Sequence, residues 1–292
     1  MSVAHAQPSI LAGQLACGQS LSFRLGLDKD PRPALARLAE NFDPSYAILG
    51  IGSPLAAALG VSIPGLRAFP AITGPGLSVP STQQALWIFL KAPDRSGLFD
   101  AAAALEWLID DAFELEDATE TFTYAGGRDL TGYVDGTNNP TAEEAPGVAL
   151  VASGAGMEGS SFVGVQRWAH DLALFRSHHV HVRDNMVGRR HSDNVELKDA
   201  PETSHVKRTD QEITGMMLRR SMPWAGARDR GLEFIAFGAT LDIFERSLRR
   251  MAGDEDGIVD ATFRYSRPTT GSYYWCPPTV AGKLNLTKLG IS

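Results

Sequence analysis

The sequence predicts an α+β fold made of two tandem ferredoxin-like (βαββαβ) modules, in which antiparallel sheets carry peripheral helices. The chain has 292 residues, long enough for two domains of about 150 residues each. Hydrophobic residues make up 43% of it and charged residues 21%, as in globular proteins with a packed core. The same order of strand-like and helix-like segments also occurs twice along the chain.

Six segments of the first half follow the order strand, helix, strand, strand, helix, strand. The fifth is helical because Leu98, Ala102 and Leu105 recur at the spacing of one helix face. The sixth is rich in β-branched and aromatic residues that alternate with polar ones, as in a half-buried strand. We expect the six segments at residues 20–27, 33–42, 45–52, 85–92, 97–111 and 116–125.

The second half repeats this order, and its last helix is marked by Leu241, Phe244 and Leu248 on one face. Between the halves the chain is rich in Gly, Asn, Pro and Ala, as a linker is. We expect the second set at residues 161–170, 171–178, 213–222, 231–240, 241–251 and 271–278. We therefore place an N-terminal module at residues 1–128, a linker at 129–160 and a C-terminal module at 161–292.

The composition argues against several classes of function. The net charge of −7 gives no general basic field for nucleic acid. Cys17 and Cys276 form no CxxC pair, which argues against a zinc knuckle and fits a reducing compartment. No secretory signal is recognisable, and no stretch approaches the ~20 apolar residues that span a bilayer. We expect a cytoplasmic protein that binds neither nucleic acid nor membrane.

Asp135 lies between glycines in GYVDGTNNP (132–140), within the linker. Asp and Asn beside Gly close turns by bonding nearby backbone N–H groups, so a structural turn is one interpretation. A functional carboxylate is the other. The stretch by itself favours the turn, and other residues must decide.

Histidines gather in the second half, and HHVH (178–181) suggests a metal site. In a strand, His179 and His181 would share one face, but no acidic or cysteine third ligand is close in sequence. We therefore interpret this run as polar surface and keep a haem-free metal hydrolase as a remote alternative. His205 is flanked by turn formers and polar residues, and is either a surface histidine or an axial ligand.

Arg219 and Arg220 close a predicted strand dominated by apolar residues. Successive side chains of a strand point to opposite faces, so one of the two faces inward. A buried arginine is rare unless it meets an anion or a fixed negative charge. One arginine is therefore a candidate site residue, and a salt bridge to Asp or Glu is the alternative.

Taken together, these segments resemble the dye-decolourising peroxidases (DyP-type), haem enzymes of two ferredoxin-like modules. The resemblance covers most of the chain and is most specific from residue 126 onward. Its length and compact loops are similar to the bacterial B-type subgroup. The segments that carry it are GYVDG (132–136), like the family's GxxDG; VGRRHSDNVEL (187–197) with SHVKR (204–208); RRSMPW (219–224); and DGIVDATFRYSRPTTGSYYWCPP (256–278).

The resemblance implies one haem b per chain in the C-terminal module, with His205 as the axial ligand of the iron. It implies that Asp135 moves a proton between the peroxide oxygens and that Arg219, rather than Arg220, supplies positive charge. The glycines around Asp135 would let the backbone lie close to the flat haem face. A carboxylate base predicts best activity in mildly acidic solution.

Further assignments follow from the same resemblance. Ser221 shares a face with Arg219 by strand alternation and is grouped with the catalytic residues, although relatives often carry asparagine there. Asp260, with Asp242 in reserve, is expected to accept Nδ1–H of His205, unless it is a helix cap or a surface acid. Arg189 is expected at a haem propionate, with a surface salt bridge as the alternative.

The implied function is reduction of hydrogen peroxide with oxidation of dyes, phenolic or other bulky aromatic donors. The alternative is a haem carrier or sensor, or a porphyrin-processing protein of the same superfamily, which would not need an ionised Asp135. The resemblance also implies a homo-oligomer. An encapsulating shell protein is a further possible partner, through the tail KLNLTKLGIS (283–292), although we prefer to interpret that tail as a terminal piece of the fold.

Overall fold

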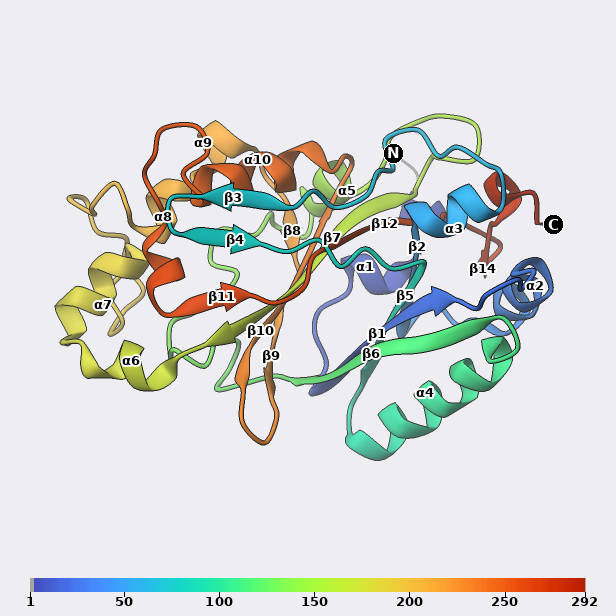
Figure 1. The fold of residues 1–292 in the computed structure, drawn as a ribbon, viewed down its shortest axis with the longest axis horizontal. Coiled ribbons are helices and arrows are strands. Elements are labelled where there is room, and N and C mark those ends of the chain that lie inside the picture. Colours follow the sequence, from blue (N-terminus) through green and yellow to red (C-terminus); the bar gives the residue numbers. More distant parts are fainter. Residues whose placement is uncertain (1–2, 292) are drawn as a thin grey trace.

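The computed structural model of the protein describes residues 3–291. Its main sheet has ten strands in the order β11-β7-β12-β2-β5-β1-β6-β9-β10-β8. Because β7 also pairs with β10, the strands between them close into a barrel (Figure 1). The strands of this sheet are β1 (Cys17–Leu25), β2 (Ala47–Gly52), β5 (Leu86–Ala92), β6 (Phe113–Phe122), β7 (Ser161–His170), β8 (Leu218–Arg219), β9 (Met222–Ala225), β10 (Arg230–Gly238), β11 (Ser266–Pro268) and β12 (Ser272–Cys276).

Each half of the chain contributes four antiparallel strands to the barrel in a matching order. The first half gives β2-β5-β1-β6, and the second gives β9-β10-β7-β12. Two further pairings join the halves, β2 with β12 and β6 with β9. The expectation of antiparallel sheets is confirmed, but the two halves share one continuous sheet.

The helices lie mainly at the two ends of the molecule (Figure 1). At one end α2 and α4 pack against each other, and at the other α8 and α9 pack against α10. No helix within residues 3–291 is long and apolar enough to cross a membrane. The helices are α1 (Pro8–Leu11), α2 (Arg32–Asn41), α3 (Ser53–Ala58), α4 (Arg95–Ile109), α5 (Ala145–Ala149), α6 (Leu172–Ser177), α7 (Val180–Val187), α8 (His205–Arg208), α9 (Gln211–Thr214) and α10 (Asp242–Met251), with 3₁₀ turns at Val3–His5, Ala261–Arg264 and Thr287–Leu289.

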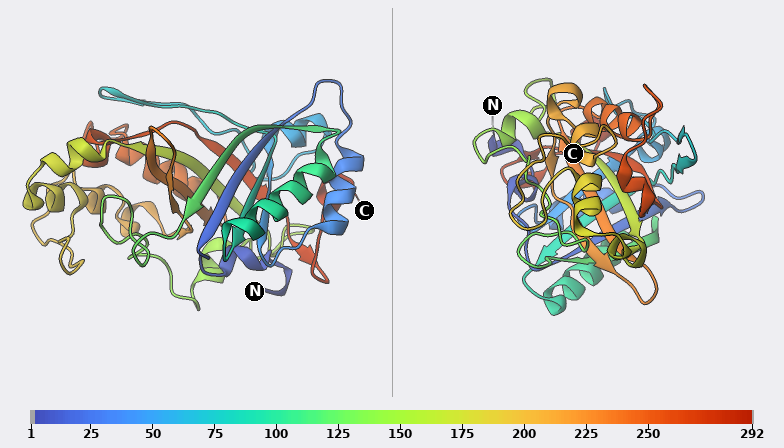
Figure 2. Two further views of the ribbon diagram at one scale, coloured as in Figure 1. Left: turned by 90° about the horizontal axis from the view of Figure 1, so that it is seen from below. Right: turned by 90° about the vertical axis from the view of Figure 1, so that its left-hand side faces the viewer.

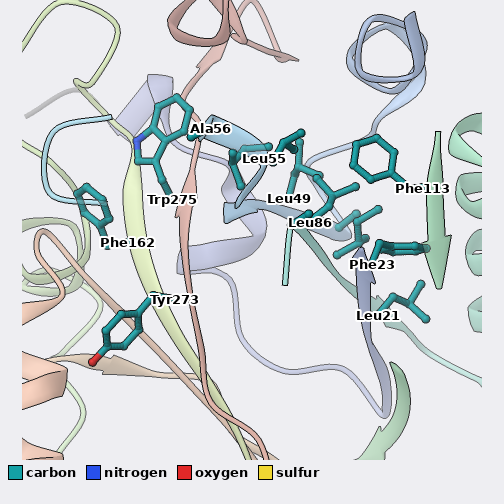
Figure 3. Close-up of a cluster of buried hydrophobic side chains, with 14 of the residues drawn as sticks. Leu21, Phe23, Leu49, Leu55, Ala56, Leu86, Phe113, Phe162, Tyr273 and Trp275 are labelled. Carbon is teal, nitrogen blue, oxygen red and sulfur yellow. The ribbon is translucent and has the colours of Figure 1, made fainter. Parts of the chain in front are cut away.

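The largest buried apolar cluster spans both halves (Figure 3). Leu21 and Leu86 enter it from the first half, and Phe162 and Trp275 from the second. The expected apolar face of α4 is confirmed, because the side chains of Leu98, Ala102, Leu105 and Ile109 are all buried. A continuous core of this kind ties the halves together in the same way as the shared sheet.

Two short hairpins complete the fold, β3 (Ile72–Gly74) with β4 (Leu77–Val79), and β13 (Thr279–Val280) with β14 (Lys283–Leu284). The first leaves the N-terminal half and runs along the second half (Figures 1 and 2). A Cβ atom on Gly74 would lie 2.0 Å from the carbonyl oxygen of Ala252, directly after α10. Only glycine permits this approach, so the hairpin lies against the end of a helix from the other half.

The strand expected at residues 213–222 is only partly correct. Residues 213 and 214 end α9, and the remainder divides into β8 and β9 with a gap at Arg220 and Ser221. The ladder is interrupted because the carbonyl of Arg220 accepts a hydrogen bond from Gln14 Nε2, while Ile235 N–H is directed to Ser221 Oγ at 3.4 Å. Side chains therefore bond two of the backbone groups at this point, while the N–H of Arg220 still bonds to the carbonyl of Ile235 at 2.8 Å.

The histidine run HHVH does not lie in a strand. His178 follows α6 and His179 caps α7, and the rings of His179 and His181 stack with centroids 5.8 Å apart. Within residues 3–291 no group of three metal-ligating side chains is gathered. The interpretation as polar surface agrees with the exposure of His179 and His181.

Candidate active site

One large cavity lies in the second half of the molecule. Its volume is about 1130 Å³, which includes the open space at its mouth. All of its lining residues fall between Asp129 and Ser266. The walls are formed by alternate residues of β7 and β10, by one face of α10, and by the segment that ends at Asp135.

His205 lines this cavity at the first position of α8. Its Nδ1 lies 2.8 Å from Oδ2 of Asp260, whose side chain is wholly buried. The second carboxylate oxygen of Asp260 accepts the backbone N–H of Thr262 at 2.8 Å. Asp260 is therefore both the partner of His205 and the cap of a 3₁₀ turn. Because a carboxylate accepts Nδ1–H, the other ring nitrogen of His205 is left as the acceptor that a metal needs.

Asp135 reaches the same cavity from a tight loop. Gly132 and Gly136 have φ values of +89° and +74°, which a residue with a Cβ rarely adopts. One oxygen of Asp135 accepts the N–H of Gly136 at 2.6 Å. Asp135 therefore closes a turn and also lines the cavity.

The electrostatic setting of Asp135 is mixed. Burial raises the pKa of its carboxyl, the positive charge of Arg219 lowers it, and the negative charge of Asp129 raises it; the net pKa lies above that of an ordinary aspartate. A base with a raised pKa holds a proton more strongly, which suits a group that must both accept and return one.

Arg219 and Arg220 diverge as strand neighbours should. Arg219 lines the cavity, and its buried Nε has no hydrogen-bond partner within residues 3–291. Arg220 points away from it and donates to the carbonyls of Ile10 and Leu11 at 3.2 and 2.7 Å. A buried guanidinium N–H without a partner is costly, and this one faces a space where an anion would satisfy it.

The residues after Asp135 form hydrogen bonds that hold neighbouring segments of the site together. Asn139 bonds the backbone of Arg219 twice, accepting its N–H at 2.8 Å and donating to its carbonyl at 3.0 Å. Asn138 accepts from Arg189 at 3.0 Å, and Thr137 Oγ1 accepts from Asn194 at 2.9 Å. GTNNP thus connects the loop of Asp135 to the strand of Arg219.

A hydrogen-bonded chain of three side chains lies elsewhere in the cavity wall. His170 Nε2 is 3.1 Å from Asp129, and its Nδ1 is 2.6 Å from Ser266 Oγ. Burial opposes ionisation of Asp129, but hydrogen bonds from His170 and Thr131 outweigh it and lower the pKa. Asp129 therefore places a stable negative charge near Asp135.

Three residues expected at the site are engaged elsewhere. Ser221 does not line the cavity, because its hydroxyl is directed to the backbone of β10. Arg189 does not line it either; it pairs with Glu196 at 2.8 Å, the surface salt bridge given as its alternative. Asp242, the reserve partner for His205, pairs instead with Arg67 at 2.8 Å on the surface.

The sequence did not predict that Asn139, Asp129 and His170 belong to the site. Asn139 and Asp129 fall in stretches that also read as turns, and a turn gives no sign of a partner 80 residues away such as Arg219. The position of His170 could have been predicted from the alternation of its strand. His170 ends an alternating strand whose other inward residues, Gln166 and Trp168, share its face and also line the cavity.

Comparison with known proteins places the chain in a family. A family model described as Dyp-type peroxidase, C-terminal, matches residues 126–281. The chain belongs to the Dyp-type peroxidase family. The match covers the cavity and all of its lining residues, and the first half lies outside it.

Individual relatives agree with this family. A dye-decolorizing peroxidase of Mycobacterium tuberculosis is 32% identical over 226 residues, covering 73% of this chain and 66% of that protein. A dye-decolorizing peroxidase of Rhodococcus erythropolis is 30% identical, covering 79% and 71%. The matches thus span about two thirds of these relatives' own lengths.

Solved structures extend the likeness to nearly the whole fold. A dyp-type peroxidase protein from Shewanella oneidensis gives a TM-score of 0.87 at 28% identity, covering 98% of this chain and 97% of that one. A DypB variant from Rhodococcus jostii RHA1, solved in complex with heme, gives 0.85 at 25% identity, with 92% and 96% covered.

The residues of this cavity fit a haem group. His205 presents a ring nitrogen whose tautomer is fixed by Asp260. Leu232 and Phe234 of β10 and Phe244 of α10 supply apolar walls. Arg219 contributes the unpartnered Nε–H. An imidazole ligand, apolar walls and a hydrogen-bond donor form the set that haem proteins use.

Proposed function

We propose that this chain is a haem-dependent peroxidase that reduces hydrogen peroxide and oxidises dyes, phenolic or other bulky aromatic donors, with one haem b per chain in the cavity. The main support for this proposal is that His205, which is hydrogen-bonded to Asp260, lines the same cavity as Asp135 and Arg219. When bound, the haem iron supplies the electrons that cleave the O–O bond. The protein must hold the iron, move one proton and stabilise charge.

His205 would bind the iron through Nε2. Its Nδ1–H donates to Asp260, whose other oxygen is fixed by the backbone of Thr262. This arrangement fixes the ring and strengthens the imidazole as a ligand. Asp260 is thus proposed as a support for the ligand and not as a group that touches the substrate.

Asp135 is proposed as the proton carrier. In its ionised form the carboxylate takes a proton from one oxygen of hydrogen peroxide and returns it to the other, which then leaves as water. Because one carboxylate oxygen is held by Gly136, the other is the one available for this transfer. The raised pKa of Asp135 implies that this function weakens as the pH falls through that value.

Arg219 is proposed as the charge that stabilises peroxide as it becomes anionic. Its backbone is fixed twice by Asn139, so the point from which the side chain enters the cavity is set before substrate arrives. A haem carrier or sensor would not need this pair of charges. Ser221 and Arg189 retain only the roles inferred from resemblance, a polar neighbour of Arg219 and a propionate contact, and both would need to leave their present partners.

We also infer that each half is a ferredoxin-like module, with boundaries at residues 1–128, 129–160 and 161–292. The matching strand orders support this inference. Cytoplasmic location remains a proposal from the sequence pattern, and homo-oligomer formation remains one that the resemblance implies. The tail offers a shell protein no free segment up to residue 291, because Leu284, Leu286, Leu289 and Ile291 are buried in the main core.

The proposal is tested by adding haem to the purified protein and recording its absorption spectrum, followed by mixing with hydrogen peroxide and an aromatic donor. We expect a Soret band and peroxide-dependent oxidation of the donor. A Soret band without turnover would support the carrier or sensor instead, and no haem uptake would reject both.

A further inference from the structure

The segment that precedes β1 lies against the strand that carries Arg219. Helix α1 and the residues after it place four backbone carbonyls, those of Ser9, Ile10, Leu11 and Gly13, against cationic side chains. This segment contributes no residue to the cavity wall. Its contacts reach the cavity only through the backbone next to Arg219.

Arg220 makes the main contact. Its Nε and Nη2 donate to the carbonyls of Ile10 and Leu11 at 3.2 and 2.7 Å. Within residues 3–291 it forms no ion pair with a carboxylate, although its side chain is partly buried. The choice of arginine here is therefore explained by the two carbonyls, which its planar fork matches.

Gln14 makes a second contact, by donating from Nε2 to the carbonyl of Arg220. The N–H of Arg220 bonds to Ile235 of β10 at 2.8 Å. Side chain, carbonyl and N–H of Arg220 are thus all fixed, two of them by the N-terminal segment. The resulting gap between β8 and β9 lies directly after Arg219.

Lys91 anchors the same segment from β5. Its Nζ donates to the carbonyls of Ser9 and Gly13 at 2.7 and 3.2 Å, and the residue is 4% exposed. A buried cation, Lys91, and a partly buried one, Arg220, therefore hold a short stretch of backbone in place. Burial of charge at this level persists only where hydrogen bonds compensate it.

We propose that residues 8–14 position Arg219, with Arg220 as the positioning residue that connects them. Asn139 holds the backbone of Arg219 from the linker side, and Arg220 holds the following peptide from the N-terminal side. The guanidinium of Arg219 then needs no contact of its own and keeps Nε free for an anion. The inference rests on the proposed function, in which Arg219 acts on an anion in the cavity.

The test uses Arg220→Gln in the full chain, compared with Arg220→Lys and Arg219→Leu. Arg37→Gln is the matched control, because Arg37 also donates to a helix carbonyl, that of Leu108 at 3.1 Å, but does not line the cavity. The first readout is the Kd of fluoride for the haem-loaded protein, followed by absorbance. Fluoride is an anion that would accept a charge-assisted hydrogen bond from Arg219.

We expect Arg220→Gln to raise the fluoride Kd on the order of 10-fold, since small misplacements of preorganised groups have effects of this size. Arg220→Lys should show a smaller rise, because one carbonyl contact can persist. Arg219→Leu should show the largest rise, and Arg37→Gln none. An unchanged Kd in Arg220→Gln would overturn the proposal.

The second readout is hydrogen exchange of residues 218–221 in the haem-free protein, which does not depend on the proposed activity. We expect faster exchange in Arg220→Gln and parental exchange in Arg37→Gln. If the chain takes up no haem, the proposed function fails while this readout still decides the positioning. If Arg220→Gln does not fold, Gln14→Ala and Lys91→Met replace it, and parental exchange in both would overturn the proposal.

Discussion

The two halves of the barrel arrange four strands in the same order, but they fill the space between the strands and the covering helix differently. In the first half, the buried face of α4 (Leu98, Ala102, Leu105 and Ile109) joins the main apolar core with its own sheet. In the second half, the buried face of α10 consists of Phe244, Ser247, Leu248 and Met251, and all four line the cavity.

This difference shows that the same arrangement of strands and helix can hold a packed core in one half and a candidate active site in the other. The strand faces follow the same rule, since Leu21 and Phe23 of β1 join the apolar core, whereas Gln166, Trp168 and His170 of β7, the matching strand of the second half, line the cavity. Helix and strand periodicity is alike in both halves. The two halves differ because the second has polar residues, such as Ser247 and His170, at inward-facing positions where a packed core would have apolar ones.

The largest expected effect concerns the cavity ligand. His205→Ala should abolish stable haem binding, since the only iron ligand we propose is removed. Titration with haem and the Soret band measure this, with His181→Ala as a control on the exposed histidine run. Full occupancy and an unchanged spectrum in His205→Ala would refute the assignment.

The packing difference can be tested by the same substitution in each half. Leu105→Ala should destabilise the haem-free protein by about 2–5 kcal/mol, as deletions in packed cores do. Leu248→Ala should cost less, because the side chain already borders open space, although the two leucines are 4% and 3% exposed. Urea unfolding of both variants measures this, and equal losses would show that the cavity wall is packed as tightly as the core.

Arg219→Leu should slow the reaction of the haem-loaded protein with hydrogen peroxide on the order of 10² or more, the typical loss for a preorganised charge stabiliser. Stopped-flow mixing measures the rate, and the spectrum before mixing should still show bound haem. A parental rate would mean that the positive charge in this cavity is structural.

Asp135→Asn should also keep haem bound and should slow the same reaction less than Arg219→Leu. General acid–base groups typically contribute ~10² to 10⁴, but water held by Arg219 can relay the proton in part. The same stopped-flow experiment ranks the two variants. A greater loss in Asp135→Asn would reverse the proposed division of work.

The smallest effect concerns pH. In the parent, the rate with peroxide should fall as the pH drops through the raised pKa of Asp135 and the carboxylate becomes protonated. Asp129→Asn removes one of the charges that raise this pKa, so the acidic limb should move to lower pH. The exposed Asp110→Asn should leave the profile in place. An unmoved limb in Asp129→Asn would show that the charge of Asp129 does not contribute to the raised pKa of Asp135.

Local pattern predicted most elements of both halves, because apolar spacing reports which face of a helix or strand is buried. It could not predict the pairing of β2 with β12 or of β6 with β9, because pairing between distant segments leaves no periodic signal. The division between β8 and β9 was missed for a related reason, since Gln14, which interrupts the ladder, is far away in sequence.

The candidate site was predictable where a residue type is rare in its setting. An arginine in an apolar strand is such a case, although the pattern left Arg219 and Arg220 open. The resemblance chose Arg219, and it also selected Asp135, whose stretch by itself favoured a turn; both residues line the cavity. Ser221 and Arg189 do not line the cavity, and short-range alternation and charge say nothing about the partners that compete for them. The hydroxyl of Ser221 accepts the N–H of Ile235, and the guanidinium of Arg189 pairs with the carboxylate of Glu196.

The pairing of β2 with β12 also determines the order in which the barrel can be completed during synthesis. Tyr274 pairs with Gly52, and Gln7 donates to the carbonyl of Pro277 at 2.9 Å. The edge of β2, whose residues are all buried in the finished fold, therefore stays unpaired while more than two hundred further residues are translated. An apolar edge exposed for that long is prone to association with other chains, so nascent chains of this protein should depend on chaperones until β12 leaves the ribosome.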